Sequence, residues 1–353
     1  MRLRENELIE RFQLRQIISE YLDKFDVLSI NVPLLEYYAP EEHLRILNIK
    51  KTKEGKFLYS LPEPSKIESF AKEVHSKFDE IRQKRTDPVE IRINIETWIR
   101  DALLRCGLCE HGNLERDVMR FIKSYDDIIL APDTNILLNC VITSILLPKI
   151  NEKINEEIKG CPNWILIAIP KLVMNEVERW ATRRFSAEEF LPKAGWPKYE
   201  GRIGQRALQE ILELDTNIDF KGVSIMTIGE IPPTYDSFKN DPARWDSEIR
   251  FQVRDFISKI SFHKGAFFIT QDRINAMMAR AEGLQALFLQ KPEYVELVKK
   301  YLVSEDPSSV LYELAVSFGE IEIEKIGKFS VFWPEKHVDD WEKSRLMVTQ
   351  LYS

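Results

Sequence analysis

The sequence lacks several features that would point to simple classes of protein. It has only 13 glycines in 353 residues, which argues against long flexible linkers. No apolar run reaches the ~18–20 residues that cross a bilayer, and the N-terminal segment lacks the apolar core of a signal peptide. No glycine-rich phosphate loop occurs, so ATP use is not indicated. No serine or cysteine nucleophile motif occurs either. We expect a soluble, cytoplasmic protein without membrane association.

The sequence also has no excess of positive charge and few cysteines. The formal net charge is −7, so no basic field covers the whole protein, and a polyanion needs a local basic surface or metal ions. Among the four cysteines, Cys106 and Cys109 form a lone CxxC motif, with His111 nearby. A structural zinc site usually needs four ligands, and no second pair is visible. The favoured interpretation is two cysteines at a helix end.

The length favours two or three domains of roughly 100–200 residues each. Apolar residues make up 44% of the chain and charged residues 30%, an ordinary balance for a globular protein. Helical spacing of apolar residues predicts an N-terminal helical domain over residues 1–124, with a strand expected only at 56–61. Residues 291–353 are expected to form a small α+β element, with strands at 310–324 and 329–332.

The central region, residues 125–290, has a different pattern. Its apolar runs are short and unbroken, which is typical of strands buried on both faces in a parallel sheet; they cover 128–131, 165–169, 223–228 and 266–269. Helical patterns separate them, at 171–184, 204–214, 246–260 and 273–282. This alternation predicts an α/β fold with a doubly wound, mostly parallel sheet flanked by helices.

Acidic residues stand at or just past the expected strand ends. Asp133 directly follows the first strand, Glu176 follows the second by seven residues, and Asp272 follows the fourth closely. Asp246 is expected to begin a helix whose apolar face turns inward. Ligands of open α/β sheets lie beyond the carboxyl ends of the strands. Because acids gathered there would repel one another, we expect a divalent cation, Mg²⁺ or Mn²⁺, between them.

Four segments in this region resemble the motifs of the PIN-domain family. Residues 131–135 resemble its D-x-N motif, 169–177 its second motif with a glutamate, 246–249 its D-x-x-I motif and 269–273 its T-x-D motif. The resemblance covers residues 125–290 and implies a PIN-like, metal-dependent endoribonuclease. It implies that the metal ligands are Asp133, Glu176, Asp246 and Asp272. Asn135 and Thr270 would orient ligands or water.

A basic stretch follows the second motif. Residues 171–206 include eight basic residues and five acidic ones. Aromatic residues that could stack on unpaired bases lie among them. The candidates for nucleic-acid contacts are Arg179, Arg183, Arg202 and Arg206, with Arg206 the first choice for a phosphate. The expected partner is single-stranded RNA. The alternative for each residue is an ordinary solvated helix face.

Other interpretations stay open. An aspartate after a strand is often a helix N-cap and not a ligand. The domain could be a non-catalytic RNA-binding or assembly scaffold, or a toxin-type ribonuclease, although the stretch from Glu176 to Asp246 is long for the compact toxins. No feature identifies a reader of the 2′-hydroxyl, so DNA remains a candidate substrate. The sequence also leaves open whether the protein forms a homo-oligomer.

Overall fold

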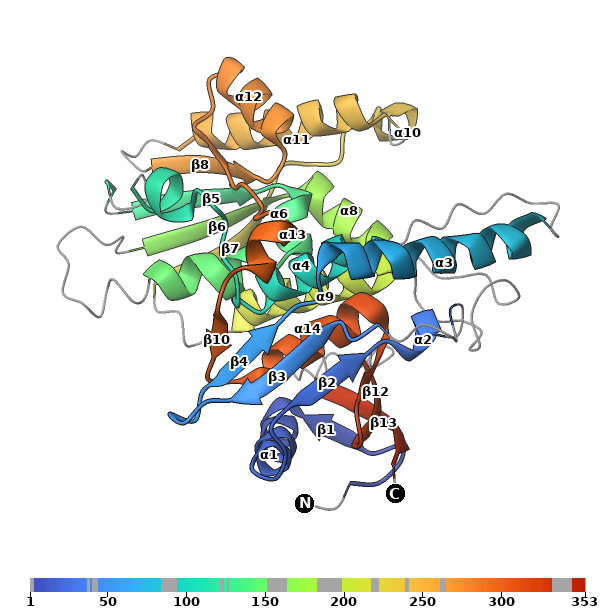
Figure 1. Ribbon diagram of the computed structural model, residues 1–353. Helices are drawn as coiled ribbons and strands as arrows, with labels where there is room; N and C mark the ends of the chain where they lie inside the picture. The colour runs from blue at the N-terminus through green and yellow to red at the C-terminus, as the bar shows by residue number, and fades with distance from the viewer. Residues whose placement is uncertain are drawn as a thin grey trace. The chain divides into compact units, whose positions relative to one another are not determined.

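The computed structural model describes residues 3–36, 39, 44–83, 94–120, 124–125, 127–150, 164–182, 199–216, 222–238, 241–260, 265–331 and 345–352. The chain divides into two compact units. The first comprises Met1–Cys109, Arg184–Tyr199 and Pro292–Ser353, and the second comprises Glu110–Arg183 and Glu200–Lys291. Each unit contains its own β-sheet, and the protein is an α/β protein (Figure 1). None of the described helices is both long and apolar enough to span a membrane.

The first unit is built on an eight-stranded sheet in which all neighbouring strands are antiparallel. Its order is β1-β13-β12-β11-β2-β3-β4-β10. The strands from the N-terminal part are β1 (Leu8–Glu10), β2 (Leu28–Asn31), β3 (Leu47–Lys51) and β4 (Phe57–Ser60). Those from the C-terminal part are β10 (Leu302–Ser304), β11 (Glu320–Ile323), β12 (Gly327–Val331) and β13 (Arg345–Leu351).

The first unit contains several helices, one of which is almost fully buried. They are α1 (Arg11–Leu22), α2 (Pro33–Glu36), α3 (Pro64–Gln83), α4 (Ile95–Arg105), α13 (Tyr294–Val298) and α14 (Pro307–Phe318). Helix α14 contacts α1 and α4 as well as β11, β12 and β13. Because it is enclosed on several sides, nearly all of its side chains are buried.

The two ends of the chain differ from the expected domains. Residues 1–124 were expected to be helical and residues 291–353 to form a separate element, but strands from both segments share one sheet. For example, Leu8 in β1 pairs with Met347 in β13. The expected strand at 310–324 is also corrected, since Pro307–Phe318 is helical and only Glu320–Ile323 is a strand. The expectation failed because partners hundreds of residues apart leave no local pattern.

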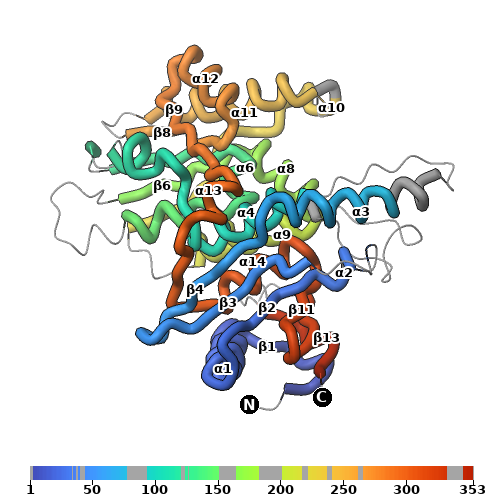
Figure 2. The backbone as a smooth tube through the Cα atoms, in the orientation of Figure 1, coloured from blue at the N-terminus to red at the C-terminus, as the bar shows by residue number. Residues whose placement is uncertain are grey.

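The second unit contains a sheet of five parallel strands in the order β7-β6-β5-β8-β9. Strands β6, β8 and β9 of this sheet are labelled in Figure 2. The five strands are β5 (Asp127–Pro132), β6 (Trp164–Pro170), β7 (Val223–Ile228), β8 (Gly265–Thr270) and β9 (Ala286–Phe288). The first four coincide with the strands expected from the apolar runs. The order of connection reverses between β5 and β8, the two strands that precede Asp133 and Asp272.

Helices connect these strands as expected. They are α6 (Thr134–Leu138), α8 (Lys171–Ala181), α9 (Tyr199–Thr216), α10 (Tyr235–Phe238), α11 (Pro242–Ser258) and α12 (Arg273–Ala281), with π-helical turns η1 (Leu114–Met119) and η2 (Ile142–Leu146). Helix α11 begins earlier than predicted. Asp241 caps it by accepting a hydrogen bond from the Arg244 amide, and Pro242 occupies its first turn. Asp246 therefore lies one turn inside this helix and not at its start.

Candidate functional site

The site lies where the strand order of the parallel sheet reverses. Asp133 follows β5 directly, and its backbone amide donates to the carbonyl of Ile269 in β8 at 2.8 Å. Asp272 follows β8 after one intervening residue. In open α/β sheets such a reversal leaves a crevice at the carboxyl ends of the strands, and ligands bind there. Both aspartates thus stand at the position that this fold offers to a ligand.

Four hydrogen bonds hold the buried carboxylate of Asp133, which is 5% exposed. Its Oδ1 accepts from the Thr134 amide at 2.8 Å, so Asp133 is the N-cap of α6. Its Oδ2 accepts from Thr270 Oγ1 at 2.6 Å, Asn135 Nδ2 at 2.9 Å and Asn275 Nδ2 at 3.0 Å. Burial raises the pKa of Asp133, and these hydrogen bonds oppose the shift. Asn135 and Thr270, expected to orient a ligand, therefore contact Asp133.

Thr134 connects Asp133 to Glu176. Its amide donates to Asp133, and its Oγ1 donates to Glu176 Oε2 at 2.6 Å. The same Oε2 accepts from Trp245 Nε1 at 3.1 Å. Burial raises the pKa of Glu176, and the charge of Asp133 raises it further, whereas the hydrogen bond from Thr134 lowers it. Glu176 on α8 is therefore held close to the end of β5, as the sequence predicted.

Asp246 and Asp272 complete the acidic group in different ways. The pKa of Asp246 is raised to about 7, first by burial and then by the charges of Asp133 and Glu176, with a further contribution from Asp272. Asp272 is exposed and caps α12, because its Oδ1 accepts from the amides of Ile274 at 2.7 Å and Asn275 at 3.0 Å. The charges of the other three acids all raise the pKa of Asp246, so the four acids lie in one neighbourhood.

Asn275 is a component that the sequence did not reveal. Its backbone amide donates to Asp272 and its Nδ2 to Asp133, so it connects these two acids. Its Oδ1 accepts from Arg250 Nη1 at 2.6 Å, and Arg250 in turn bonds Glu282 at 2.9 and 3.0 Å. A signal was available, because Asn275 lies three residues after an N-cap and in the first turn of the helix that follows β8. Trp245, which contacts Glu176, had no such signal.

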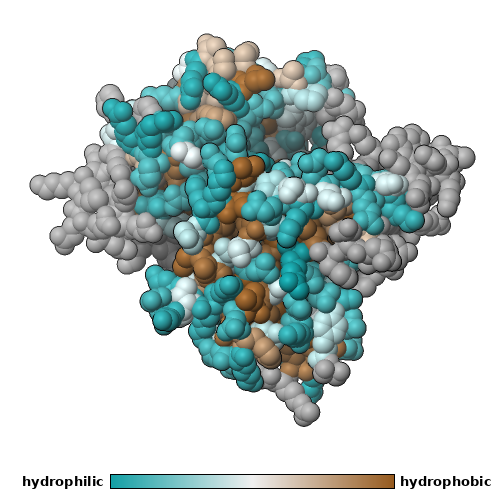
Figure 3. Space-filling model, viewed as in Figure 1, coloured by the Kyte–Doolittle hydropathy of each residue, from teal (hydrophilic) through white to brown (hydrophobic). Residues whose placement is uncertain are grey.

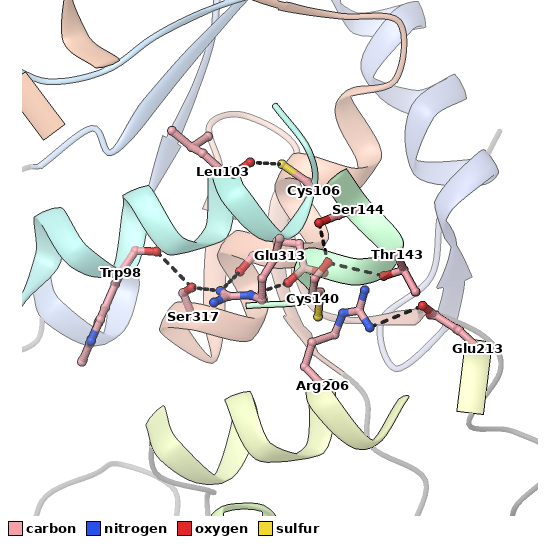
Figure 4. Close-up of polar contacts among 11 residues, drawn as sticks. Trp98, Leu103, Cys106, Cys140, Thr143, Ser144, Arg206, Glu213, Glu313 and Ser317 are labelled. Atoms are coloured by element: carbon pink, nitrogen blue, oxygen red, sulfur yellow. Dashed lines mark hydrogen bonds and ion pairs between the residues drawn. The ribbon is translucent and has the colours of Figure 1, made fainter. Parts of the chain in front are cut away.

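The predicted basic residues fall into three groups. Arg202 and Arg206 on α9 are only 3% and 5% exposed. Arg206 Nη1 lies 3.6 Å from Glu213 Oε2, about two turns further along the same helix (Figure 4). Burial leaves these two guanidinium groups no surface for a phosphate, which differs from the expectation. Arg183 lies outside the described residues.

Arg179 is the predicted basic residue that stands at the acidic group. It is exposed on α8, and its guanidinium carbon lies 5.6 Å from the centre of the Trp245 ring. Its charge also lowers the pKa of Glu176. The side chain thus presents a cation beside the acids.

The donor set can be compared with what a metal ion requires. Carboxylate oxygens are the hard ligands that Mg²⁺ and Mn²⁺ prefer. Across the described part of the chain, however, no three His, Cys, Asp or Glu side chains lie close enough to hold an ion together. Mg²⁺ usually keeps several waters and binds through one or two carboxylates. The residues therefore fit a hydrated ion on one or two carboxylates, and direct ligation by all four acids stays a prediction.

Comparisons with known proteins do not identify a family. No family model matches the chain, and no curated protein matches it. One solved structure with partial similarity is a domain of a functionally unknown protein from Methanocaldococcus jannaschii DSM 2661. The two are 21% identical over 47% of this chain and 93% of that domain, with a TM-score of 0.32. This similarity supports no argument about fold or function.

Proposed function

We propose that the protein is a metal-dependent endoribonuclease of the PIN type, which hydrolyses phosphodiester bonds of single-stranded RNA. The observation that carries the proposal is the linkage of three acids at the reversal of the sheet. Thr134 bonds both Asp133 and Glu176, and Asn275 bonds both Asp133 and Asp272. Residues distant in the sequence are thus held together where an α/β sheet binds its ligand. Helix capping alone does not require such shared partners.

The ion would be Mg²⁺ or Mn²⁺, held by Asp133 together with Glu176 or Asp246. When bound, it would supply an activated water and stabilise the charge of the phosphoryl group during displacement. The protein's own side chains prepare this site. Three neutral donors fix Asp133 Oδ2, and the Asp246 carboxyl, with its pKa near 7, can hold or release a proton at neutral pH. Arg179 would contact a phosphate of the RNA chain.

Asp133→Asn tests the proposal. The substitution keeps the side-chain shape but removes a metal ligand. We expect cleavage to fall by at least about 100-fold, since even residues that only orient ligands contribute roughly 10–100-fold. The measurement is cleavage of labelled single-stranded RNA and DNA with Mg²⁺, Mn²⁺ or EDTA. The matched control is Asp241→Asn, which changes another N-cap aspartate of the same unit to an equally good cap. Equal Mn²⁺-dependent cleavage by wild type and Asp133→Asn would refute the assignment.

A non-catalytic RNA-binding module is the second candidate. It is favoured by the fact that Asp133 and Asp272 both cap helices, which gives them a structural role without any metal. The same assay separates the two functions. A binding module should retain RNA in EDTA and should release no cleaved product with any ion, whereas the nuclease should require Mg²⁺ or Mn²⁺ for its product.

A further inference from the structure

The second unit has a cavity of about 790 Å³ that belongs to none of the acids described above. It is lined by residues of η1, β8, β9 and α12, together with Tyr125. Along α12 the lining residues are Arg273, Ala276, Met277 and Arg280, which share one helix face because they are spaced by three, four and seven positions. Its volume lies within the range of about 300–1,000 Å³ that is usual for small-molecule sites.

The cavity is positively charged in a protein of net charge −7. Three arginines and one aspartate line it, and the other lining residues are neutral. Arg273 is exposed, and none of the described residues engages its guanidinium. Arg280 bonds the Ala286 carbonyl through Nε at 3.1 Å and Nη2 at 2.8 Å, which leaves Nη1 available. Arg116 pairs with Asp117 at 2.7 Å at the exposed rim. The lining therefore suits an anion.

An aromatic wall stands beside these cations. The Tyr125 ring packs edge-on against Phe267, with 5.6 Å between ring centres and 73° between ring planes. Gly265 makes this position possible, because a Cβ there would lie 2.7 Å from the Tyr125 ring and 2.9 Å from the Phe267 ring. Tyr125 is half-buried, so part of its surface remains accessible. Such a ring offers a stacking surface for a base.

Hydrogen-bonding amides complete the lining. Gln285 and Gln290 are both exposed members of the cavity wall. A ligand that combines an anionic group with a flat ring bearing hydrogen-bonding edges would use the arginines, Tyr125 and these amides together. A lone anion would leave the aromatic wall unused, and an apolar ligand would leave the arginines unpaired. A nucleotide satisfies all three kinds of contact.

We propose that this cavity binds one nucleotide, either free or as part of a single-stranded RNA, with its base on Tyr125 and its phosphate on Arg273 and Arg280. Nucleotide binding follows from the cavity alone. Its connection to cleavage rests on the proposed function. Arg273 is the neighbour of Asp272 in sequence, so an RNA held here would pass close to the acidic group. The cavity would then hold a nucleotide near the scissile phosphate.

Exposed apolar side chains also lie on α12, and Figure 3 shows some hydrophobic atoms among hydrophilic ones at the top of the view, where this helix lies. Ile274, Met277 and Met278 are 73%, 59% and 47% exposed. Of these, Met277 also lines the cavity. Its flexible thioether side chain can adjust to the sugar or the base of a nucleotide.

Isothermal titration in EDTA tests the cavity without metal-dependent chemistry. The full chain is titrated with AMP, UMP, adenosine, inorganic phosphate and a single-stranded hexaribonucleotide. We expect the nucleoside monophosphates to bind at least about tenfold more tightly than adenosine or phosphate, because each of these offers one of the two recognised groups. Equal affinity for the monophosphates and the hexamer indicates a free nucleotide as ligand. Tighter binding of the hexamer indicates RNA. Failure of both to bind overturns the proposal.

Variants connect this binding to the cavity. Arg273→Gln should weaken AMP binding about tenfold, and Tyr125→Leu at least about fivefold, whereas Tyr125→Phe should retain it. The matched control is Arg254→Gln, an exposed arginine on α11 that does not line the cavity, which should bind as wild type. Unchanged binding by Arg273→Gln, whose exposed side chain is not needed for folding, overturns the proposal. Asp133→Asn should bind AMP normally, so failure of the nuclease assignment and failure of this site are distinguishable.

Discussion

Two buried carboxylates, one in each unit, are held by different kinds of hydrogen-bond donor. Glu313 on α14 is 3% exposed, and its Oε2 accepts from Arg105 Nε at 2.8 Å. Arg105 also donates to Ser317 Oγ, which in turn donates to the Trp98 carbonyl at 3.1 Å (Figure 4). Asp133 is buried to a similar degree, but all four of its hydrogen-bond donors are neutral.

This difference in donors indicates that Glu313 has a structural role, whereas the charge of Asp133 is available to a ligand. A buried carboxylate paired with arginine carries its own counter-ion, and the pair acts as a fixed internal contact. A carboxylate held only by hydroxyl and amide dipoles keeps its full negative charge, which is costly in a buried position. The first arrangement explains why Glu313 needs no external ion. The second favours cation binding at Asp133.

The largest expected effect comes from removing the internal counter-ion. Arg105→Met leaves Glu313 buried and unpaired, so the free energy of unfolding should fall by about 3–5 kcal/mol, as measured by urea denaturation. Replacing both partners, Arg105→Met with Glu313→Leu, should recover most of this loss. Arg116→Met, which breaks the exposed pair with Asp117, is the control and should change stability little. A similar loss in Arg105→Met and Arg116→Met would contradict the comparison.

A divalent cation should bind at Asp133 and stabilise the folded protein. At about 100 times its dissociation constant, Mn²⁺ should raise the free energy of unfolding of the wild type by about 2.7 kcal/mol, because it binds only the folded state. Asp133→Asn should lose this stabilisation. The measurement is urea denaturation with Mn²⁺ and with a monovalent salt of equal ionic strength. An equal gain in wild type and Asp133→Asn would show that the ion binds elsewhere.

The smallest effect is a dependence on pH that arises from Asp246. Because its folded-state pKa is raised from 3.8 to about 7, the folded protein holds this proton more tightly than the unfolded chain does. Its contribution to stability is complete below about pH 4 and is lost as the pH rises toward 7. The free energy of unfolding of Asp246→Asn, relative to that of the wild type, should therefore increase from pH 4 to pH 7. The measurement is urea denaturation in EDTA. A constant difference would contradict the shift. Because Asp246 is only half-buried, solvent screening keeps this effect small.

Four strands of the parallel sheet could be predicted from the sequence, whereas only two strands of the antiparallel sheet could, β4 within the expected 56–61 and β12 overlapping the expected 329–332. Strands β5, β6, β7 and β8 are short apolar runs, each followed by a helix, and all of them except the edge strand β7 are largely buried. Strand β1 has only three residues, and its partner β13 lies at the other end of the chain. Pairing over such a distance depends on tertiary structure and leaves no local periodicity.

Helix α14 shows a second limit of pattern analysis. Eleven of its twelve residues are buried, so it lacks the polar stripe that identifies a surface helix. The segment was therefore predicted to be part of a strand. Its boundaries did carry a signal, because Asp306 caps the helix and Pro307 follows in its first turn.

The candidate site could be predicted in part. The positions of Asp133, Glu176 and Asp272 follow from strand ends, which local patterns locate well. The contacts of Asn275 and Trp245 depend on where α11 and α12 pack, and this is not encoded locally. The burial of Arg202 and Arg206 was missed because basic side chains on a helix usually face solvent.

The pairing of β1 with β13 has a consequence for the order of folding during synthesis. The ribosome releases Leu8–Glu10 long before Arg345–Leu351, so β1 can pair with β13 only at the end of synthesis. Every segment of the parallel-sheet unit emerges in between, since Lys291 precedes the last part of the first unit. That inserted unit can fold while translation continues. The unit formed by the two chain ends is then completed last, once β13 has left the ribosome.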